Sequence, residues 1–295
     1  MASLSSRHAP LFRLALAGLL AFTLVGCAGK PDLPAALRAP VYTDAPYARV
    51  LAAAVRDGLV DYPAIAEPAG NHPAAGPAAD PDALDVQLDV YLDALARFGP
   101  ESTPDQFPTE ADRFAYHLNA YNAFMLRKWL DQGARTAKPT DKVGWLTWFT
   151  LDRWALDGGS TTLHGLEQYL IRPTYEDGRL HAALICGAIA CPPLRNEPFR
   201  GPVLNAQLDD QMRQWLNNPS EKAVTLLDDG RVQLATIFKW YRGDFENMTG
   251  PDEGLAGVLR KYLDDADPRK PKILAAAEAG RITFPAYDWS INLAK

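Results

Sequence analysis

The sequence lacks the short motifs that most directly identify an enzyme. It contains no Gly-x-Ser-x-Gly, no His-Glu-x-x-His, no phosphate-binding glycine loop and no dinucleotide fingerprint. We therefore expect no cofactor. Cysteine and histidine are also scarce, with three and five residues in 295. His181, Cys186 and Cys191 could supply three metal ligands, but they lack the paired spacing of zinc sites, so a metal site is the least favoured alternative.

Basic residues and long apolar runs are in short supply too. The chain has 30 Lys and Arg against 36 Asp and Glu, a formal net charge of −6. A nucleic-acid-binding protein needs basic stripes to neutralise phosphates, so we expect no nucleic-acid partner. Only one apolar run approaches membrane length. A hydrophobic content of 47% with 22% charged residues is typical of a globular protein with a real core.

The single apolar run, residues 14–25, stands at the N-terminus behind Arg7 and Arg13. A basic start, a short apolar stretch and a small residue before the cut predict a secretory signal over residues 1–26, too short to span a membrane stably. The residues Leu-Val-Gly-Cys at 24–27 resemble the lipobox of bacterial lipoproteins. The alternatives are an ordinary signal peptide or a single anchor helix.

The lipobox resemblance implies cleavage before Cys27, a diacylglycerol thioether on its thiol and an acylated amino end. Several acyl chains hold a protein on a membrane far better than one. Residue Ala28 is not the Asp associated with retention in the inner membrane. We therefore expect a lipid-anchored protein of the bacterial cell envelope, at the outer membrane and facing the periplasm. Removing residues 1–26 takes away two arginines and no acid, which lowers the net charge to −8.

The remaining chain predicts a short tether and one globular domain. Residues 27–48 form the tether and residues 49–295 the domain, with a Pro/Ala/Gly-rich mobile insertion near 63–82. Helices and a few strands follow without regular β-α alternation, which predicts an α+β fold, a helix-rich single domain around a small, mainly antiparallel sheet. The expected helices are 84–99, 110–131, 202–217, 254–264 and 271–279, and the expected strands are 179–186, a hairpin at 222–235 and the final stretch.

The stretch Leu180 to Leu194, LHAALICGAIACPPL, carries most of the unusual chemistry. A strand ending at Cys186-Gly187 could present a thiol at a sheet edge, and a nearby base would make that thiol nucleophilic. His181 lies five residues upstream, so on a regular strand its side chain would face the opposite way. His117 and His164 are equally admissible bases. Alternatively, Cys186 and Cys191 are buried as small apolar residues or form a disulfide around a very short loop.

Two asparagines interrupt the helix predicted at 110–131. Asn119 and Asn122 are three residues apart and therefore share a face, although asparagine is a poor helix former. They either hold a neighbouring loop or line a pocket and orient a base or a substrate amide. Glu167 lies three residues after His164, a spacing that allows a carboxylate to orient an imidazole. The aromatic run around Trp240, with Asp244, predicts an aromatic anchor with a salt-bridged rim.

Five motifs in order resemble the family called domain of unknown function 547, over about residues 45–292. They are NAYNA (119–123), LHGLEQYLIR (163–172), RLHAALICGAIACPPL (179–194), IFKWYRGDF (237–245) and YDWSIN (287–292). The resemblance implies one polar constellation that contains Asn119, Asn122, Glu167, His181, Cys186 and Cys191, and it implies no particular reaction. The chain departs from the family pattern at His117-Leu118 and at Gln168, where the family commonly has a histidine.

Two functions from different classes remain. The first is a thiol-dependent hydrolase or acyl-transferase acting on an amide or ester in the envelope. In it Cys186 is the nucleophile, His181 or His117 the base, and Asn119 or Asn122 an orienting group or oxyanion donor, with Glu167 in the same site. The second is a non-catalytic envelope scaffold or ligand-binding lipoprotein, in which the cysteines are core or disulfide. Under either function, the expected partners of the protein are the membrane, through Cys27, and an unidentified small molecule or envelope substrate.

Overall fold

The computed structural model describes residues 33–66, 80–133, 146–220, 223–250 and 252–294. The predicted signal peptide and Cys27 lie outside these residues, and so does most of the insertion predicted near 63–82. Residues 45–48, which we had assigned to the tether, already belong to helix α1 (Ala45–Ala54). The ordered fold therefore begins slightly before the predicted domain boundary.

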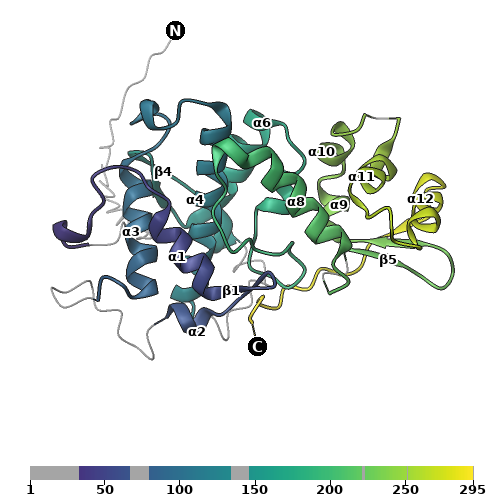
Figure 1. Ribbon diagram of the computed structural model, residues 1–295, viewed down its shortest axis with the longest axis horizontal. Coiled ribbons are helices and arrows are strands. Elements are labelled where there is room, and N and C mark those ends of the chain that lie inside the picture. The colour runs from purple at the N-terminus through teal and green to yellow at the C-terminus, as the bar shows by residue number, and fades with distance from the viewer. Residues whose placement is uncertain (1–32, 67–79, 134–145, 221–222, 251, 295) are drawn as a thin grey trace, which may run out of the picture.

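Helix α4 (Glu110–Asp131) is the central element of one half of the molecule (Figure 1). Thr109 and Asp112 cap its start reciprocally: Asp112 N donates to Thr109 Oγ1 and Thr109 N donates to Asp112 Oδ2, both at 3.1 Å. The helix runs as predicted. Helix α3 (Leu84–Arg97) packs on α4, and α1 packs on α3. Their apolar faces form the larger of two hydrophobic cores, which buries Trp129 completely.

The second core lies under α8 (Leu204–Asn217) and the C-terminal helices, on the right in Figure 1. Aromatic rings dominate it: Trp215 stacks on Phe238 with ring centroids 5.0 Å apart, and Phe245 packs on Phe238 at 4.4 Å. The helices around this core are α9 (Thr236–Trp240), α10 (Arg242–Asn247), α11 (Gly254–Tyr262) and α12 (Lys270–Glu278).

Within the described residues the strands form three small sheets rather than one. Two are hairpins, β1 (Val55–Arg56) with β2 (Leu59–Val60) and β3 (Trp154–Leu156) with β4 (Gly159–Thr161). In the third, β5 (Val224–Leu226) pairs antiparallel with β6 (Val232–Leu234), and β7 (Ile282–Thr283) joins β6 in parallel. The molecule is mostly helical with small, mostly antiparallel sheets, which confirms the α+β class.

Short helical segments connect these parts. Two of them are π-helical, η3 (Leu146–Leu151) and η4 (Gly165–Ile171), and η4 continues directly into α6 (Arg172–Tyr175). The hydroxyl of Thr162 caps the start of η4 by accepting from Gly165 N at 2.9 Å. The others are η1 (Ala35–Leu37), α2 (Tyr62–Ile65), η2 (Pro104–Gln106), α7 (Leu180–Ala183) and η5 (Gly201–Val203).

The strand predicted over residues 179–186 is wrong. Leu180–Ala183 form the single helical turn α7, which packs on α8, and the chain becomes extended only from Leu184 onward. A short apolar run fits a buried strand and a buried helical turn equally well, so its periodicity could not separate them. This difference matters because the argument that placed His181 and Cys186 on opposite faces assumed a regular strand.

The C-terminal tail returns across the molecule to the first half, where the end of the chain lies beside β1 (Figure 1). Ile291 bridges antiparallel to Ala188, and Leu293 bridges parallel to Val60. The backbone N–H of Asn292 donates to the carbonyl of Gly187 at 3.0 Å, and the side-chain oxygen of Asn292 accepts from Tyr62 Oη at 2.8 Å. The tail thus ties the segment around Cys186 to the N-terminal hairpin.

Candidate functional site

A cavity of about 460 Å³, here called the His181 cavity, opens where six segments meet. Helix α4, segment η3, segment η4–α6, residues 181–191, the end of α9 and the C-terminal tail each contribute side chains. Its volume is within the range of small-molecule sites. The titratable and sulfur-bearing lining residues are Tyr121, His164, Glu167, Arg172, His181, Cys186, Cys191, Tyr241 and Tyr287.

His181 is held in this cavity by a carboxylate 63 residues further on. Its Nε2 lies 2.7 Å from Asp244 Oδ2, and its ring stacks on Tyr241 with centroids 3.8 Å apart. Arg172 grips the same carboxylate with two bonds, from Nε at 2.8 Å and from a terminal nitrogen at 3.0 Å. Within the described residues, the other imidazole nitrogen, Nδ1, makes no hydrogen bond.

The electrostatics favour a neutral imidazole facing a charged carboxylate. Burial lowers the pKa of His181, although the bond to Asp244 opposes that shift. The bonds from His181 and Arg172 hold the pKa of Asp244 well below its usual range. Because Asp244 is ionised, Nε2 carries the proton of the bond, and Nδ1 keeps its lone pair. A histidine in this state is able to accept a proton.

Glu167 forms a second polar group in the His181 cavity. Its carboxylate accepts from Tyr241 Oη at 2.7 Å, from Tyr121 Oη at 3.2 Å and from Gln168 Nε2 at 2.8 Å. Burial and the neighbouring carboxylate raise the pKa of both tyrosines above their ordinary value, so both hydroxyls stay protonated and donate. Tyr241 therefore joins the two groups, since its ring supports His181 and its hydroxyl holds Glu167.

Cys186 and Cys191 form a disulfide in the wall of the His181 cavity, with their Cα atoms 6.4 Å apart. This was one of the alternatives that the sequence left open. The hydroxyl of Tyr287 lies 3.2 Å from Cys186 Sγ and 3.1 Å from Cys191 Sγ. Cys186 is half-buried and Cys191 buried. The structure therefore places His181 and Cys186 in one cavity, but with the sulfur oxidised.

The backbone around Cys186 is fixed by two contacts with α4. Trp129 Nε1 donates to the carbonyl of Cys186 at 3.0 Å. Gly187, with φ of 77°, comes so close to that indole that an added Cβ would overlap it. Glycine is therefore required directly after the cysteine.

Asn119 and Asn122 are buried and lie outside the lining of the His181 cavity. The side-chain amide of each asparagine both donates a hydrogen bond to the backbone of a neighbouring segment and accepts one from it. Asn119 donates to the carbonyl of Phe199 at 2.8 Å and accepts from its N–H at 2.9 Å. Asn122 donates to the carbonyl of Ala183 and accepts from Ile185 N, both at 2.9 Å. This corresponds to the alternative in which they hold a neighbouring loop.

The two other candidate histidines differ in position. His117 does not line the His181 cavity; its Nδ1 lies 2.7 Å from Tyr175 Oη, and burial lowers its pKa to about 4. His164 lines the cavity and packs edge-on against Tyr169. Of the predicted site residues, the structure thus brings together Glu167, His181, Cys186 and Cys191.

Sequence reasoning missed three contributors to this site, Asp244, Arg172 and Tyr287. The predicted salt-bridged rim at Asp244 is present, but its carboxylate also binds His181. Arg172 and Tyr287 belong to two of the motifs quoted from the sequence, but nothing in those motifs assigned them to the site. The signal that could have linked them was the resemblance itself, because all three lie within its five motifs.

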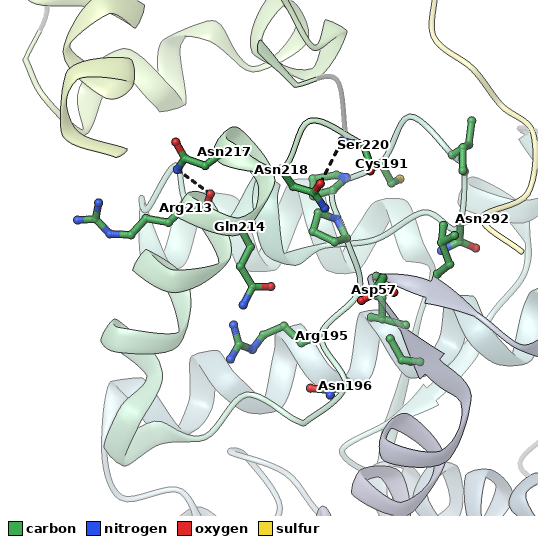
Figure 2. A pocket seen from close by; sticks show the side chains of 18 residues that line it. Asp57, Cys191, Arg195, Asn196, Arg213, Gln214, Asn217, Asn218, Ser220 and Asn292 are labelled. Carbon is green, nitrogen blue, oxygen red and sulfur yellow. Dashed lines mark hydrogen bonds between the residues drawn. The ribbon is translucent and has the colours of Figure 1, made fainter. Parts of the chain in front are cut away.

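A second, larger cavity of about 840 Å³ shares Cys191 with the first (Figure 2). Its polar lining includes Asp57, Arg195, Asn196 and Gln214. Arg195 is already paired with Asp210 at 2.6 Å and Glu197 at 2.7 Å. None of the histidines in the described part of the chain lines this cavity, so the candidate for acid-base chemistry is the smaller one.

Among the described residues no group of three or more His, Cys, Asp or Glu side chains is arranged to hold a metal ion. In the same part of the chain, no helix combines the length and apolarity needed to cross a membrane. The lipid anchor predicted at Cys27 stays a prediction.

The fold and the cavity describe a helix-rich α+β protein with a polar site between its two cores. Residues 104–216 match a family model described as protein of unknown function, DUF547. This confirms the family resemblance for that part of the chain, whereas the motifs at 237–245 and 287–292 lie beyond the matched range. Comparison with curated proteins gives no significant match, and neither does comparison with solved structures.

Proposed function

We propose that the His181 cavity is the active site of a hydrolase or acyl-transferase that uses the thiol of Cys186 on an amide or ester. The observation that carries this proposal is the bond between His181 and Asp244, because His181 lines the same cavity as Cys186. A base oriented by a carboxylate, next to a sulfur, is the arrangement needed to activate a nucleophile.

The proposed reaction begins with the reduced protein. An external thiol or dithiol reduces the Cys186–Cys191 disulfide and is itself oxidised. Nδ1 of His181 then takes the proton from the Cys186 thiol, and the thiolate attacks the acyl carbonyl. The leaving amine or alcohol receives that proton as its bond to the acyl group breaks, and a thioester remains. Water completes hydrolysis by releasing the acid, while a second amine or alcohol completes transfer.

Neighbouring groups support this order of events. Asp244 fixes the tautomer of His181 and stabilises the imidazolium that forms when it takes a proton. Tyr287 Oη, 3.2 Å from Cys186 Sγ, stays protonated because burial raises its pKa. It can therefore donate a hydrogen bond to the thiolate. Asn122 acts through position, since it fixes the backbone at Ile185, one residue before the nucleophile.

A non-catalytic ligand-binding function is the second candidate, and one observation favours it. With the disulfide formed, the cavity still offers aromatic and polar walls, and no free thiol is available from Cys186 or Cys191. Either function is proposed to operate in the bacterial envelope, on a protein held at the membrane through Cys27. The lipobox resemblance and the signal sequence support that location.

Exchanging each cysteine in turn tests the enzyme proposal. Hydrolysis of p-nitrophenyl acetate and labelling by iodoacetamide are measured with and without dithiothreitol. We expect wild type to be active only after reduction, Cys191→Ser to be active without reductant, and Cys186→Ser to be inactive under both conditions. Cys191→Ser is the matched control because it removes the same disulfide. Equal rates for Cys186→Ser and Cys191→Ser would refute a nucleophilic Cys186 and leave the binding function.

A further inference from the structure

One wall of the His181 cavity is aromatic, and the function of its outer rings is not explained by acid-base chemistry. Trp240, Tyr287 and Trp289 pack against one another there. The ring centroids of Trp240 and Tyr287 lie 4.7 Å apart, those of Tyr287 and Trp289 4.6 Å, and those of Trp240 and Trp289 6.3 Å. All three rings line the cavity, and they come from two distant segments, α9 and the C-terminal tail.

These rings remain partly open to solvent. Trp240 is 49% exposed, although a large aromatic side chain normally gains from burial. Trp289 is half-buried. Within the described residues neither indole N–H makes a hydrogen bond, so each indole offers an apolar face together with an unused donor. An exposed aromatic surface at the edge of a cavity is typical of a binding site.

The lining of the cavity also contains a polar group of residues. Segment η4–α6 contributes Glu167, Gln168 and Arg172, and His164 joins them. These groups supply donors and acceptors in planar, fixed arrangements, because Gln168 bonds to Glu167 and Arg172 is bound to Asp244. A ligand in this cavity therefore meets both aromatic rings and hydrogen-bonding groups.

We propose that this wall is a sugar-binding subsite, and that the ligand of the cavity is a pyranose carrying an N-acyl group. A pyranose has an apolar C–H face that can lie on the rings of Trp240 and Trp289. Its hydroxyl groups suit the polar side chains of the same cavity. The cavity lining carries the carboxylate of Glu167, and the guanidinium of Arg172 in the same lining is already bound to Asp244, an arrangement that disfavours phosphate-bearing ligands such as nucleotides.

This inference deepens the proposed function and rests on it in one respect: the acyl group on the sugar is what the thiol of Cys186 would attack. Binding itself needs no thiol. The oxidised protein should therefore bind the sugar even though it cannot perform the reaction.

Calorimetric titration of the oxidised wild-type protein with chitotriose tests the subsite. We expect binding, and we expect Trp240→Ala and Trp289→Ala each to weaken it by about tenfold or more, since an aromatic contact contributes on this scale. Trp240→Phe should recover most of the affinity because it keeps a ring. Tyr169→Ala is the matched control, because this tyrosine is 76% exposed and does not line the cavity.

The outcomes separate the two proposals. If chitotriose does not bind while reduced protein hydrolyses the ester, the sugar subsite is refuted and the enzyme proposal stands. If chitotriose binds while Cys186→Ser and Cys191→Ser behave alike in hydrolysis, the enzyme proposal is refuted and the subsite stands. Binding of acetylcholine or adenosine in place of chitotriose would also overturn the assignment to a sugar. Since Trp240 is half exposed, its replacement should leave the thermal unfolding midpoint nearly unchanged. An unchanged midpoint shows that a loss of binding is not caused by a loss of the fold.

Discussion

The imidazole of His181 and the carboxylate of Asp244 meet at 2.7 Å, although α7 and α10 belong to parts of the chain 63 residues apart. The contact joins two elements, and Arg172 binds the same carboxylate from a third element. This arrangement ties the proton-accepting ability of His181 to the charge of a single side chain, from which a first prediction follows.

Asp244→Asn should lower the hydrolysis rate of the reduced protein by about 100-fold or more, because an oriented base contributes on this scale. The amide can no longer fix the tautomer with its charge or stabilise the imidazolium. The rate with p-nitrophenyl acetate is measured across pH. Asp209→Asn serves as the control, since this carboxylate pairs with Arg179 at 2.8 Å outside the cavity. An unchanged rate in Asp244→Asn would remove the dyad from the mechanism.

The buried His117 should make the protein less stable in mild acid. Its pKa is about 4 in the folded protein because burial disfavours the charged ring, against about 6.5 when unfolded. Between these values the unfolded chain binds more protons, so the free energy of unfolding decreases as the pH falls from 6.5 towards 4. The loss should reach at most about 3 kcal/mol.

His117→Gln should flatten this part of the stability curve, because glutamine does not titrate. Urea unfolding at pH 7.0, 5.5 and 4.5 measures the effect. His181→Gln is the matched comparison. Burial also lowers the pKa of His181, so this histidine too should make the protein less stable as the pH falls. If His117→Gln keeps the full wild-type slope, the assignment of the acid sensitivity to His117 fails.

Asn122→Ala should lower the free energy of unfolding by about 2–3 kcal/mol, because it leaves the buried carbonyl of Ala183 and the N–H of Ile185 without partners. Asn205→Ala provides the control: this asparagine is exposed and contacts Arg179. Chemical denaturation of both variants measures the difference. Equal midpoints would mean that the two buried hydrogen bonds of Asn122 stabilise the protein no more than a surface contact does.

Gly187→Ala should destabilise the protein by more than 2 kcal/mol, because two costs combine there. The backbone has φ of 77°, and the new Cβ would overlap the indole of Trp129. Gly133→Ala separates the two costs, since Gly133 has φ of 73° but no neighbour among the described residues within 4 Å of its Cβ position. That variant should lose only about 1 kcal/mol. Similar losses in thermal unfolding would show that the indole can move aside.

Reduction of the Cys186–Cys191 disulfide should cost about 2 kcal/mol of stability, a small value because the bond closes a loop of only a few residues. Unfolding in urea with and without dithiothreitol measures it, and Cys191→Ser should reproduce the reduced value without reductant. A protein that unfolds completely on reduction would make the disulfide a structural requirement and exclude a thiol reaction at Cys186.

Local signals in the sequence predicted much of the fold. The helix at 110–131 has apolar residues on every turn, and Asp229-Gly230 between alternating residues predicted the β5–β6 hairpin. The segment at 179–186 could not be predicted in the same way. Its conformation depends on Asn122 and on packing against α8, and these contacts come from elsewhere in the chain.

The candidate site was predicted only in part for the same reason. Glu167, His181 and the two cysteines stood out because polar residues are unusual in their apolar surroundings. Asp244 and Arg172 did not, since a charged pair on short helices is ordinary at a surface. Nothing in the sequence near Asp244 shows that its carboxylate reaches an imidazole 63 residues away; only the folded chain does.

The return of the C-terminal tail has a practical consequence for where the functional unit ends. The family match stops at residue 216. A fragment cut there would retain Glu167, His181 and both cysteines but would lose the partner of His181 and the rings of Tyr241, Tyr287 and Trp289. Five of the fifteen residues that line the cavity would be missing. The part of the chain that builds the cavity therefore includes the C-terminal tail, which is anchored to the N-terminal hairpin by the bridge between Leu293 and Val60.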